Sequence, residues 1–211
     1  MFTKAVLPDT FRAIQLVSKI PVFREAYLAG GTALALLIGH RISVDLDFFT
    51  QKEFDESQLS TSLHVYPEFT EQQKSWRTIL GKIGETSISL FYYKYPLLEK
   101  TTNFEGIQIV GMKDLSAMKI NAIEDRGTRR DFIDLFFLTK KYSVDEMLNF
   151  YDNKYGVLEE HLYSIIRALN YFDDAEKEVA MPKMLVDVSW DEVKSFFTKE
   201  SIRLAKLKLN V

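Results

Sequence analysis

Hydrophobic and polar residues alternate most clearly between Ile42 and Phe49, and this alternation predicts a half-buried β-strand. The two faces of the predicted strand differ in character. One face carries Ile42, Val44, Leu46 and Phe48, and the other carries Ser43, Asp45, Asp47 and Phe49. Because side chains alternate across a strand, the apolar face is expected to lie on the core and the acidic face to lie toward solvent.

The same kind of pattern predicts further elements on both sides of this strand. The pair Gly30-Gly31 opens an apolar stretch that ends at Gly39, which predicts a glycine turn leading into a short buried helix. Apolar residues at helical spacing predict helices over 8–20 and 55–64. Strands are expected at 26–29, 75–83, 86–93 and 107–110, with the middle two joined as a hairpin around Gly84-Glu85.

Beyond Gly111 the pattern changes from alternation to helix-forming residues, over 113–125 and again over 128–139. Two later Ser-x-x-Glu boxes, starting at Ser143 and Ser189, each predict the start of a helix. The sequence therefore predicts an α/β domain over 1–111 and a helical domain over 112–211.

Composition narrows the class of protein. The 211 residues include 27 Lys and Arg and 30 Asp and Glu, so a formal charge of -3 does not by itself draw the whole chain to nucleic acid. The absence of cysteine excludes disulfides, thiolate zinc sites, iron–sulfur clusters and cysteine nucleophiles. The first residues lack the apolar core of a signal peptide, and the longest apolar run is far shorter than a membrane span of about 20 residues. We therefore expect a cytoplasmic protein with no membrane segment.

Asp45 and Asp47 are the first candidates for chemistry. Two residues apart on a strand, their carboxylates would project from one face about 6 to 7 Å apart. Like charges at this distance repel unless a cation lies between them, and carboxylate oxygens are ligands that Mg²⁺ prefers. The alternative interpretation is a strand with its polar face in water.

The Gly30-Gly31 turn is the second candidate. A glycine turn that enters a helix presents backbone N–H groups and the positive end of the helix dipole, and both favour a phosphate. Thr32 adds a hydroxyl donor. A tight turn without a ligand is the simpler interpretation of the glycines alone. Together with the two acids, however, the turn predicts a site for a nucleotide and its metal.

Two segments resemble a known family. The segment AGGTALALLIGHRISVDLDFF resembles the signature of nucleotidyltransferases of the polymerase-β type. The segment MKINAIEDRGTRRDFIDLFFL, from Met118 to Leu138, resembles the AbiEii/AbiGii toxin family. The resemblance implies an α+β fold, in which a nucleotidyltransferase-like mixed β-sheet flanked by helices is followed by a helical region that contributes Lys119 and Asp131 to the cleft.

The resemblance also implies roles for individual residues. Asp45 and Asp47 would hold Mg²⁺, or Mn²⁺ in its place, and Lys119, Asp131 and Asp134 would complete the catalytic site. The residues on the nucleotide would be Gly30, Gly31, Thr32, Lys119, Arg126 and Arg130. Read without the resemblance, the charges of the second segment are solvated, and Arg130 with Asp134 is an ordinary surface ion pair at i and i+4.

One position departs from the pattern of the superfamily. Its members usually carry a third carboxylate on a neighbouring strand, and Ser89 occupies the corresponding position here. A serine hydroxyl is a poor metal ligand and cannot act as a general base. Either Glu85 or Asp131 replaces the acid, or a single-metal site works more slowly, or transfer has been lost.

The expected function is that of the family. It is Mg²⁺-dependent transfer of a nucleoside monophosphate from an NTP to an acceptor, such as tRNA or another RNA, by the toxin of a toxin–antitoxin or phage-defence system with a cognate antitoxin. Two alternatives stay open: a catalytically weak nucleotide-binding regulatory module, and a nucleotidyltransferase that acts on a small molecule.

Other side chains give weaker signals. Tyr92, Tyr93 and Tyr95 are candidates for stacking on a base, although aromatic residues at a strand end more often belong to the core or its rim. The three histidines are expected at the surface or at helix caps rather than on zinc. Of these, His40 lies with Arg41 beside the predicted site.

Overall fold

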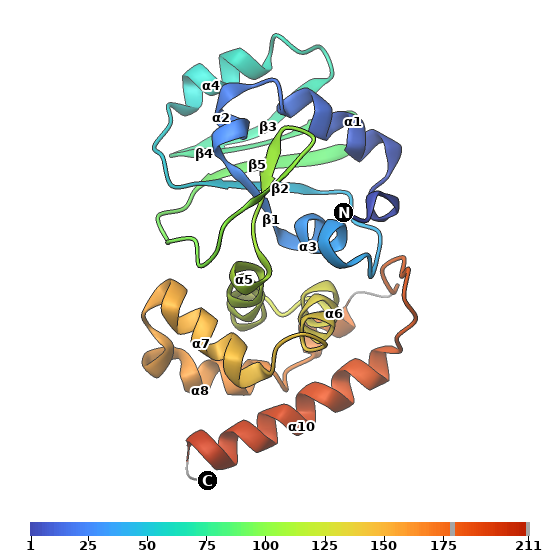
Figure 1. Ribbon diagram of the computed structural model, residues 1–211, viewed down its shortest axis with the longest axis vertical. Helices are drawn as coiled ribbons and strands as arrows, with labels where there is room; N and C mark the ends of the chain where they lie inside the picture. Colours follow the sequence, from blue (N-terminus) through green and yellow to red (C-terminus); the bar gives the residue numbers. More distant parts are fainter. Residues whose placement is uncertain (178–179, 210–211) are drawn as a thin grey trace. The chain divides into compact units, whose positions relative to one another are not determined.

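The computed structural model describes residues 1–177 and 180–209. The chain divides after Gly111 into two compact units. The first unit contains a β-sheet with flanking helices, and the second contains helices α5 to α10 (Figure 1). This is the predicted α+β class, with a mixed sheet followed by a helical region.

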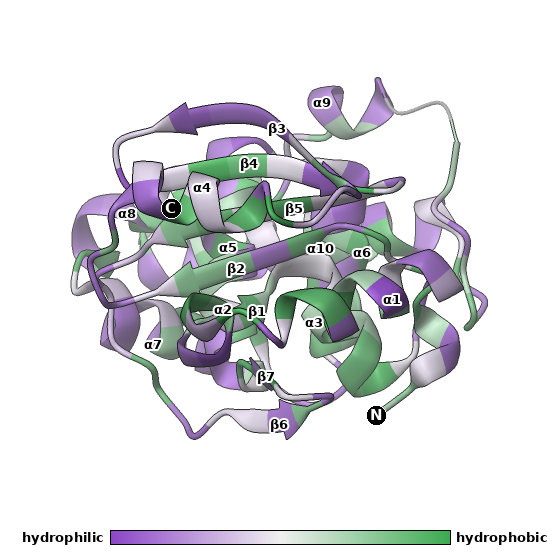
Figure 2. Ribbon diagram, turned by 90° about the horizontal axis from the view of Figure 1, so that it is seen from above, coloured by the Kyte–Doolittle hydropathy of each residue, from purple (hydrophilic) through white to green (hydrophobic). Residues whose placement is uncertain are grey.

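The sheet of the first unit has seven strands in the order β3-β4-β5-β2-β1-β7-β6, which Figure 2 shows from one side. The central strand β2 is parallel to β5 and antiparallel to β1, and β1 is parallel to β7. The strands are β1 (Tyr27–Ala29), β2 (Leu46–Thr50), β3 (Phe69–Ser75), β4 (Thr78–Ile83), β5 (Thr86–Tyr92), β6 (Thr102–Phe104) and β7 (Ile107–Ile109).

Helices cover one side of this sheet, where α1, α2 and α4 lie in Figure 1. Phe23 of α2 packs edge to face on Phe48 of β2, with ring centroids 4.9 Å apart, so this side forms the core of the unit. The helical elements are the 3-10 helix Thr3–Ala5, α1 (Pro8–Val17), α2 (Pro21–Glu25), α3 (Gly30–Ile38) and α4 (Glu56–Leu63).

Local sequence explains where these helices begin and end. Proline begins both α1 and α2, where its missing N–H costs no hydrogen bond. Asp55 caps α4 by accepting from two backbone N–H groups. Gly39, in a left-handed conformation, ends α3.

The strand predicted from Ile42 begins only at Leu46. Before that point the backbone is hydrogen bonded to other elements, because Ser43 N donates to Ala5 O and the Thr32 hydroxyl donates to Asp45 O. Ser43 is buried rather than exposed as the alternation predicts. Asp45 therefore lies just outside the strand that carries Asp47, and the prediction that both acids project from one strand face is wrong in this detail.

The hairpin around Gly84-Glu85 is present between β4 and β5. The sequence analysis predicts no strand that corresponds to the edge strand β3. The predicted strand before the hairpin starts only at Ser75. The sequence of β3 is mostly polar (Figure 2) and mostly exposed, so its strand character comes from pairing with β4 rather than from hydrophobic alternation.

The second unit is helical, with a core around Phe132. The Phe132 ring contacts the rings of Phe172, Trp190 and Phe197. Ser143 forms the predicted capping box with Glu146, and Ser189 caps its helix by accepting from Glu192 N. The helices are α5 (Met112–Asp125), α6 (Arg129–Leu138), α7 (Val144–Tyr155), α8 (Leu158–Ala168), α9 (Asp173–Glu176) and α10 (Trp190–Lys208). Within the described part of the chain, no helix is long and apolar enough to cross a membrane.

Candidate functional site

The start of α3 is held against Asp47 by the geometry of the sheet. Ala29, the last residue of β1, pairs with Asp47 of β2, so the helix begins directly beside this acid. Gly30 has a φ of +66°, and a Cβ on it would lie 2.8 Å from Asp47 Oδ2. Only glycine therefore allows the first turn of the helix to approach the carboxylate this closely.

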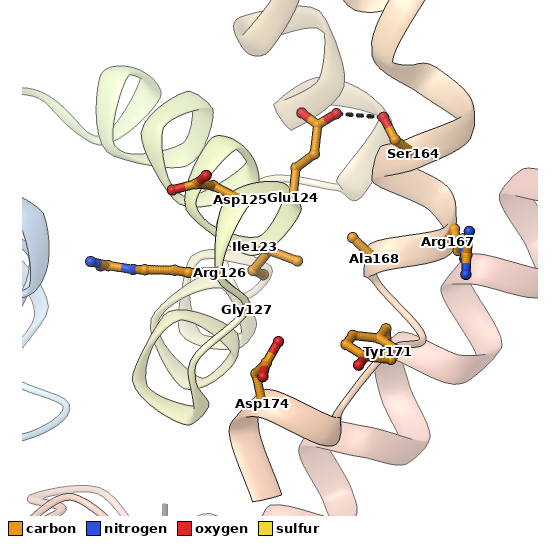
Figure 3. Close-up of a pocket in the computed structure, with 10 residues that line it drawn as sticks. All are labelled: Ile123, Glu124, Asp125, Arg126, Gly127, Ser164, Arg167, Ala168, Tyr171 and Asp174. Carbon is orange, nitrogen blue, oxygen red and sulfur yellow. Dashed lines mark hydrogen bonds between the residues drawn. The ribbon is translucent and has the colours of Figure 1, made fainter. Parts of the chain in front are cut away.

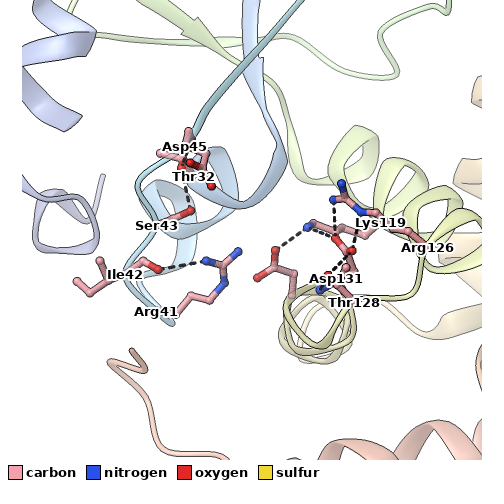
Figure 4. Close-up of polar contacts among 10 residues, drawn as sticks. Thr32, Arg41, Ile42, Ser43, Asp45, Lys119, Arg126, Thr128 and Asp131 are labelled. Carbon is pink, nitrogen blue, oxygen red and sulfur yellow. Dashed lines mark hydrogen bonds and ion pairs between the residues drawn. The ribbon is translucent and has the colours of Figure 1, made fainter. Parts of the chain in front are cut away.

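Arg41 fills the space beside the second glycine. Its Nη2 occupies the place where a Cβ of Gly31 would stand, and its Nη1 donates to Ile42 O at 3.1 Å (Figure 4). The Arg41 side chain is buried. The guanidinium of Arg41 therefore lies beside the first turn of α3, whose backbone N–H groups by themselves favour an anion.

The Thr32 hydroxyl, expected as a donor to phosphate, bonds to protein groups instead. This buried hydroxyl donates to Asp45 O and is hydrogen bonded to Ser43 Oγ at 2.8 Å (Figure 4). A hydroxyl donates one hydrogen bond and can also accept, so both contacts can form together. They tie α3 to the segment before β2. Thr32 can therefore serve a phosphate through its backbone N–H, whereas its side chain positions the segment that carries Asp45.

Ser89 lies where the sequence comparison with the superfamily places it, beside the acids. It pairs with Asp47 across β2 and β5, and its hydroxyl donates to Asp47 Oδ1 at 2.6 Å. One oxygen of Asp47 thus bonds to Ser89 and the other faces Gly30. Glu85, the alternative third acid on this hairpin, lies in the turn before β5 and therefore precedes the strand that carries Ser89.

Asp45 and Asp47 are half-buried, and their oxygens fit a magnesium ion that takes one or two carboxylates and keeps water or phosphate as its other ligands. Over residues 1–177 and 180–209, no three His, Asp or Glu side chains gather as a complete metal site. The chain thus offers a pair of acids whose cation would need oxygen ligands from a substrate.

Lys119 in the second unit is buried between two acids. Its Nζ lies 2.8 Å from Asp131 Oδ1 and 2.7 Å from Asp134 Oδ2. Asp131 also accepts from Arg126 Nε at 3.0 Å and from the hydroxyl of Thr128, which caps α6 (Figure 4). Four of the predicted site residues therefore belong to one network, which the capping residue Thr128 joins.

This network settles two of the alternative interpretations. Asp134 is fully buried, so it is not the solvated acid of a surface pair with Arg130. Lys119 and Asp131 are also buried rather than solvated. Arg130 is exposed, and the side chain of Arg126 is 62% exposed, so the solvated interpretation holds for Arg126 although it pairs with Asp131.

The charges of the network shift the ionisation of Asp131. Burial raises the pKa of its carboxyl, but the charges and hydrogen bonds of Lys119 and Arg126 outweigh burial and hold that pKa well below its ordinary value. Asp131 is therefore ionised throughout the physiological range.

The histidines fit the expectations only in part. His64 caps the end of α4, and His161 pairs with Glu124 at 2.7 Å. His40, in contrast, is completely buried, so its expected place at the surface or at a cap is wrong.

A pocket of about 310 Å³ opens next to this network in the second unit (Figure 3). Ile123 and Ala168 line it, Tyr171 and Asp174 lie at one end, and Glu124 is hydrogen bonded to Ser164 at the other. The segment from Met118 to Leu138 supplies one side of this pocket, including the predicted site residue Arg126, whereas the other side comes from α8, α9 and the residues between them, which no sequence motif indicates.

Comparisons with known proteins bear on the family of this chain. A family model described as nucleotidyl transferase AbiEii toxin of type IV toxin–antitoxin systems matches residues 14–102. An uncharacterized protein of Aquifex aeolicus (strain VF5) is 36% identical over 194 residues, which cover 89% of this chain and 92% of that protein. The chain belongs to the AbiEii family of nucleotidyltransferases.

Solved structures share the fold of this AbiEii protein. MenT4, a nucleotidyltransferase toxin of Mycobacterium tuberculosis H37Rv, has a TM-score of 0.56 at 16% identity, covering 93% of this chain and 86% of its own. JHP933 of Helicobacter pylori has a TM-score of 0.52 at 17% identity, covering 93% and 89%. These structures confirm the predicted fold, while the family match confirms the predicted family and identifies the chain as a transferase.

Replacing Gly30 by alanine tests the contact between α3 and Asp47. We expect Gly30→Ala to lose about 1 to 2 kcal/mol of unfolding free energy from its left-handed backbone and also to weaken NTP binding, because its Cβ displaces the Asp47 carboxylate. Urea denaturation and calorimetric titration with an NTP measure the two effects. Gly84→Ala is the matched control, since Gly84 also has a positive φ but has no neighbour within 4 Å. Equal NTP affinities in the two variants would contradict the role of Gly30.

The low pKa of Asp131 predicts a pH-dependent stability. Because the folded state lowers this pKa, its contribution is complete above the unfolded value of about 3.9 and is lost as pH falls through and below it. Urea denaturation from pH 6 to pH 3 should therefore show a steeper loss of unfolding free energy in the wild type than in Asp131→Asn. Asp187→Asn, at an exposed acid, should keep the wild-type slope. Parallel curves for the wild type and Asp131→Asn would refute the assignment.

Proposed function

We propose that this AbiEii protein transfers a nucleoside monophosphate from an NTP to an RNA acceptor such as tRNA, with Mg²⁺ held by Asp45 and Asp47. We further propose that it acts as the toxin of a toxin–antitoxin or abortive-infection system and that it has a cognate antitoxin. The description of the matched family as a type IV toxin–antitoxin toxin supports this biological role.

The observation that carries the chemical part is the approach of α3 to Asp47 at Gly30. Nucleotidyl transfer needs phosphate oxygens and acidic metal ligands side by side, and the start of α3 lies directly beside Asp47. Since Ala29 precedes the helix, no polar side chain at the N-cap competes for the first backbone N–H groups. These N–H groups are therefore suited to receive phosphate oxygens.

Each residue of the first unit has a part in this proposal. The N–H groups of the first turn of α3 bind the phosphates, and Arg41 adds positive charge beside them. Ser89 fixes the orientation of the Asp47 carboxylate. A bound magnesium ion supplies charge neutralisation and alignment of the triphosphate, which are the main requirements of phosphoryl chemistry.

For the second unit the proposal keeps the roles that the family resemblance assigns. Lys119, Arg126 and Arg130 are the cationic groups for the nucleotide, and Asp131 with Asp134 are the catalytic acids. The geometry adds that Lys119 already binds two carboxylates, so any phosphate contact must compete with these ion pairs. This competition predicts that Lys119 also serves to hold the two acids in place.

A second function has its own support from Ser89. Because this residue replaces an acid, a nucleotide-binding module with little or no transfer is the alternative. Stabilisation of the fold by NTP and Mg²⁺ without any labelled product would favour this module.

Incubation with labelled NTPs, Mg²⁺ and total tRNA tests the proposed transfer. We expect label in the RNA with the wild type, and a loss of at least a hundredfold in Asp47→Asn, because the amide cannot replace a charged metal ligand. Asp187→Asn, whose side chain is exposed in the second unit, should retain full activity. Labelled RNA in both Asp45→Asn and Asp47→Asn would contradict the proposed metal site. Label on small molecules alone would contradict the proposed RNA acceptor.

Restoring an acid at Ser89 tests the metal separately from turnover. In Ser89→Asp a second carboxylate would stand beside Asp47, so we expect the variant to be destabilised without a divalent cation and to regain stability on addition of Mn²⁺. Thermal unfolding with and without Mn²⁺ measures this dependence, and electron paramagnetic resonance counts the bound ions. Ser89→Asn is the matched neutral control. If Mn²⁺ stabilises neither variant, no cation binds beside Asp47.

A further inference from the structure

The sheet face that carries Asp47 continues as a row of aromatic rings. Phe49 follows Asp47 by two residues on β2, and Phe91 follows Ser89 by two residues on β5. Because residues two apart share a face, Phe49 and Phe91 lie on the side of Asp47 and Ser89. The register confirms this placement, since Asp47 pairs with Ser89 and Phe49 pairs with Phe91.

The rings contact one another in sequence along this face. The Phe49 ring lies 5.4 Å from Phe91 and 5.1 Å from Tyr93, measured between centroids, and Tyr93 lies 5.0 Å from Tyr95. Tyr93 N also donates to Thr50 O, which extends the pairing of β5 with β2 by one residue. We call Phe49, Phe91, Tyr93 and Tyr95 the aromatic row.

Burial distinguishes this row from the core. On the opposite side of the same two strands, Phe48 and Leu90 are almost completely buried under the helices. The four members of the aromatic row are only half-buried. The row therefore has aromatic surface that lies outside the core.

Tyr92, the third of the sequence candidates for base stacking, does not belong to this row. It points to the other side of β5, where its ring and that of Trp76 enclose the guanidinium of Arg77 at 4.9 Å and 4.5 Å. Arg77 is paired there with Glu53. Tyr92 thus has a structural role in holding the turn before β4.

We propose that the aromatic row is a stacking surface for a nucleobase, next to the phosphates bound at the first turn of α3. This inference rests on the proposed function and adds the place of the base. Two residues along a strand span about 6 to 7 Å, so the Phe49 ring stands one such step from the acid that lies beside the phosphates. A nucleotide has the same order of groups, because a ribose separates its phosphate from its base.

The chemistry of the row suits a base of any sequence. Aromatic rings stack on the π-face that every base possesses, and such stacking contributes about 1 to 3 kcal/mol per base. The row contains no buried charge, and Lys94 lies 5.7 Å from the Tyr95 ring, at the end that is farther from Asp47. The base can belong to the incoming NTP or to the unpaired end of an RNA acceptor, and binding experiments distinguish these two sources.

The experiment compares ligands that differ only in having a base. Calorimetry should measure the affinity of the whole chain for a non-hydrolysable NTP, for inorganic tripolyphosphate and for a short single-stranded RNA, each with Mg²⁺. In Tyr93→Leu we expect the affinity for the NTP to fall about tenfold, which corresponds to a loss of roughly 1.4 kcal/mol of binding free energy. The affinity for tripolyphosphate should stay constant. A fall for the RNA alone would assign the surface to the acceptor. Unchanged affinities for both NTP and RNA would overturn the inference.

Matched variants separate stacking from folding and from the phosphate site. Tyr93→Phe keeps the ring and should retain the wild-type affinities, and Tyr163→Leu removes an exposed ring far from the row in the sequence and should change nothing. Asp47→Asn should weaken both the NTP and tripolyphosphate. If Asp47→Asn weakens both ligands and Tyr93→Leu weakens neither NTP nor RNA, the proposed function stands and the stacking surface is refuted. If Asp47→Asn weakens neither, the proposed function itself fails.

Discussion

The close approach of α3 to Asp47 is the constraint on which the rest of the first unit depends. Gly30 adopts a left-handed backbone, and its missing Cβ leaves the space that Asp47 Oδ2 faces. The pairing of Ala29 with Asp47 fixes where the helix starts, so strand register and helix position are determined together. Arg41 and Ser43 then pack on the same turn, Arg41 against Gly31 and Ser43 on Thr32. The site is therefore built from backbone geometry first and from side chains second.

Charged side chains have different kinds of partners in the two units. In the second unit, Lys119, Asp131 and Asp134 are buried together, and the exposed side chain of Arg126 adds a second cation beside Asp131. Such a network is stable because each buried charge has an opposite charge and hydrogen bonds. In the first unit, Asp45 and Asp47 are half-buried, and the Ser89 hydroxyl donates to one oxygen of Asp47. The partner of the Asp47 carboxylate at this oxygen is thus a neutral donor, whereas Lys119 joins charges of opposite sign in the second unit.

The sequence predicts most of this fold because its strongest signals are local. The glycine turn, the helix caps and the hairpin at Gly84 depend on a few adjacent residues, and the structure contains all three. The segment 42–45 could not be predicted from alternation, since its hydrogen bonds go to Ala5 and Thr32 rather than to a neighbouring strand. The same limit applies to β3, whose polar sequence gives no sign of its pairing, and to the burial of His40. The contact between Ser89 and Asp47 depends on register, which one sequence does not determine without the family pattern.

The face of β2 and β5 shows why a serine can stand beside the acids. A third carboxylate at this position would add a charge that only a second cation could balance, whereas a hydroxyl donates to Asp47 and needs no ion. The face then changes over one step from polar groups at Asp47 and Ser89 to rings at Phe49 and Phe91. In the proposed function, a magnesium ion separates the phosphates from the Asp47 carboxylate, and in the proposed stacking surface the base lies on the rings. The order of residues along these two paired strands would then give a bound nucleotide one direction.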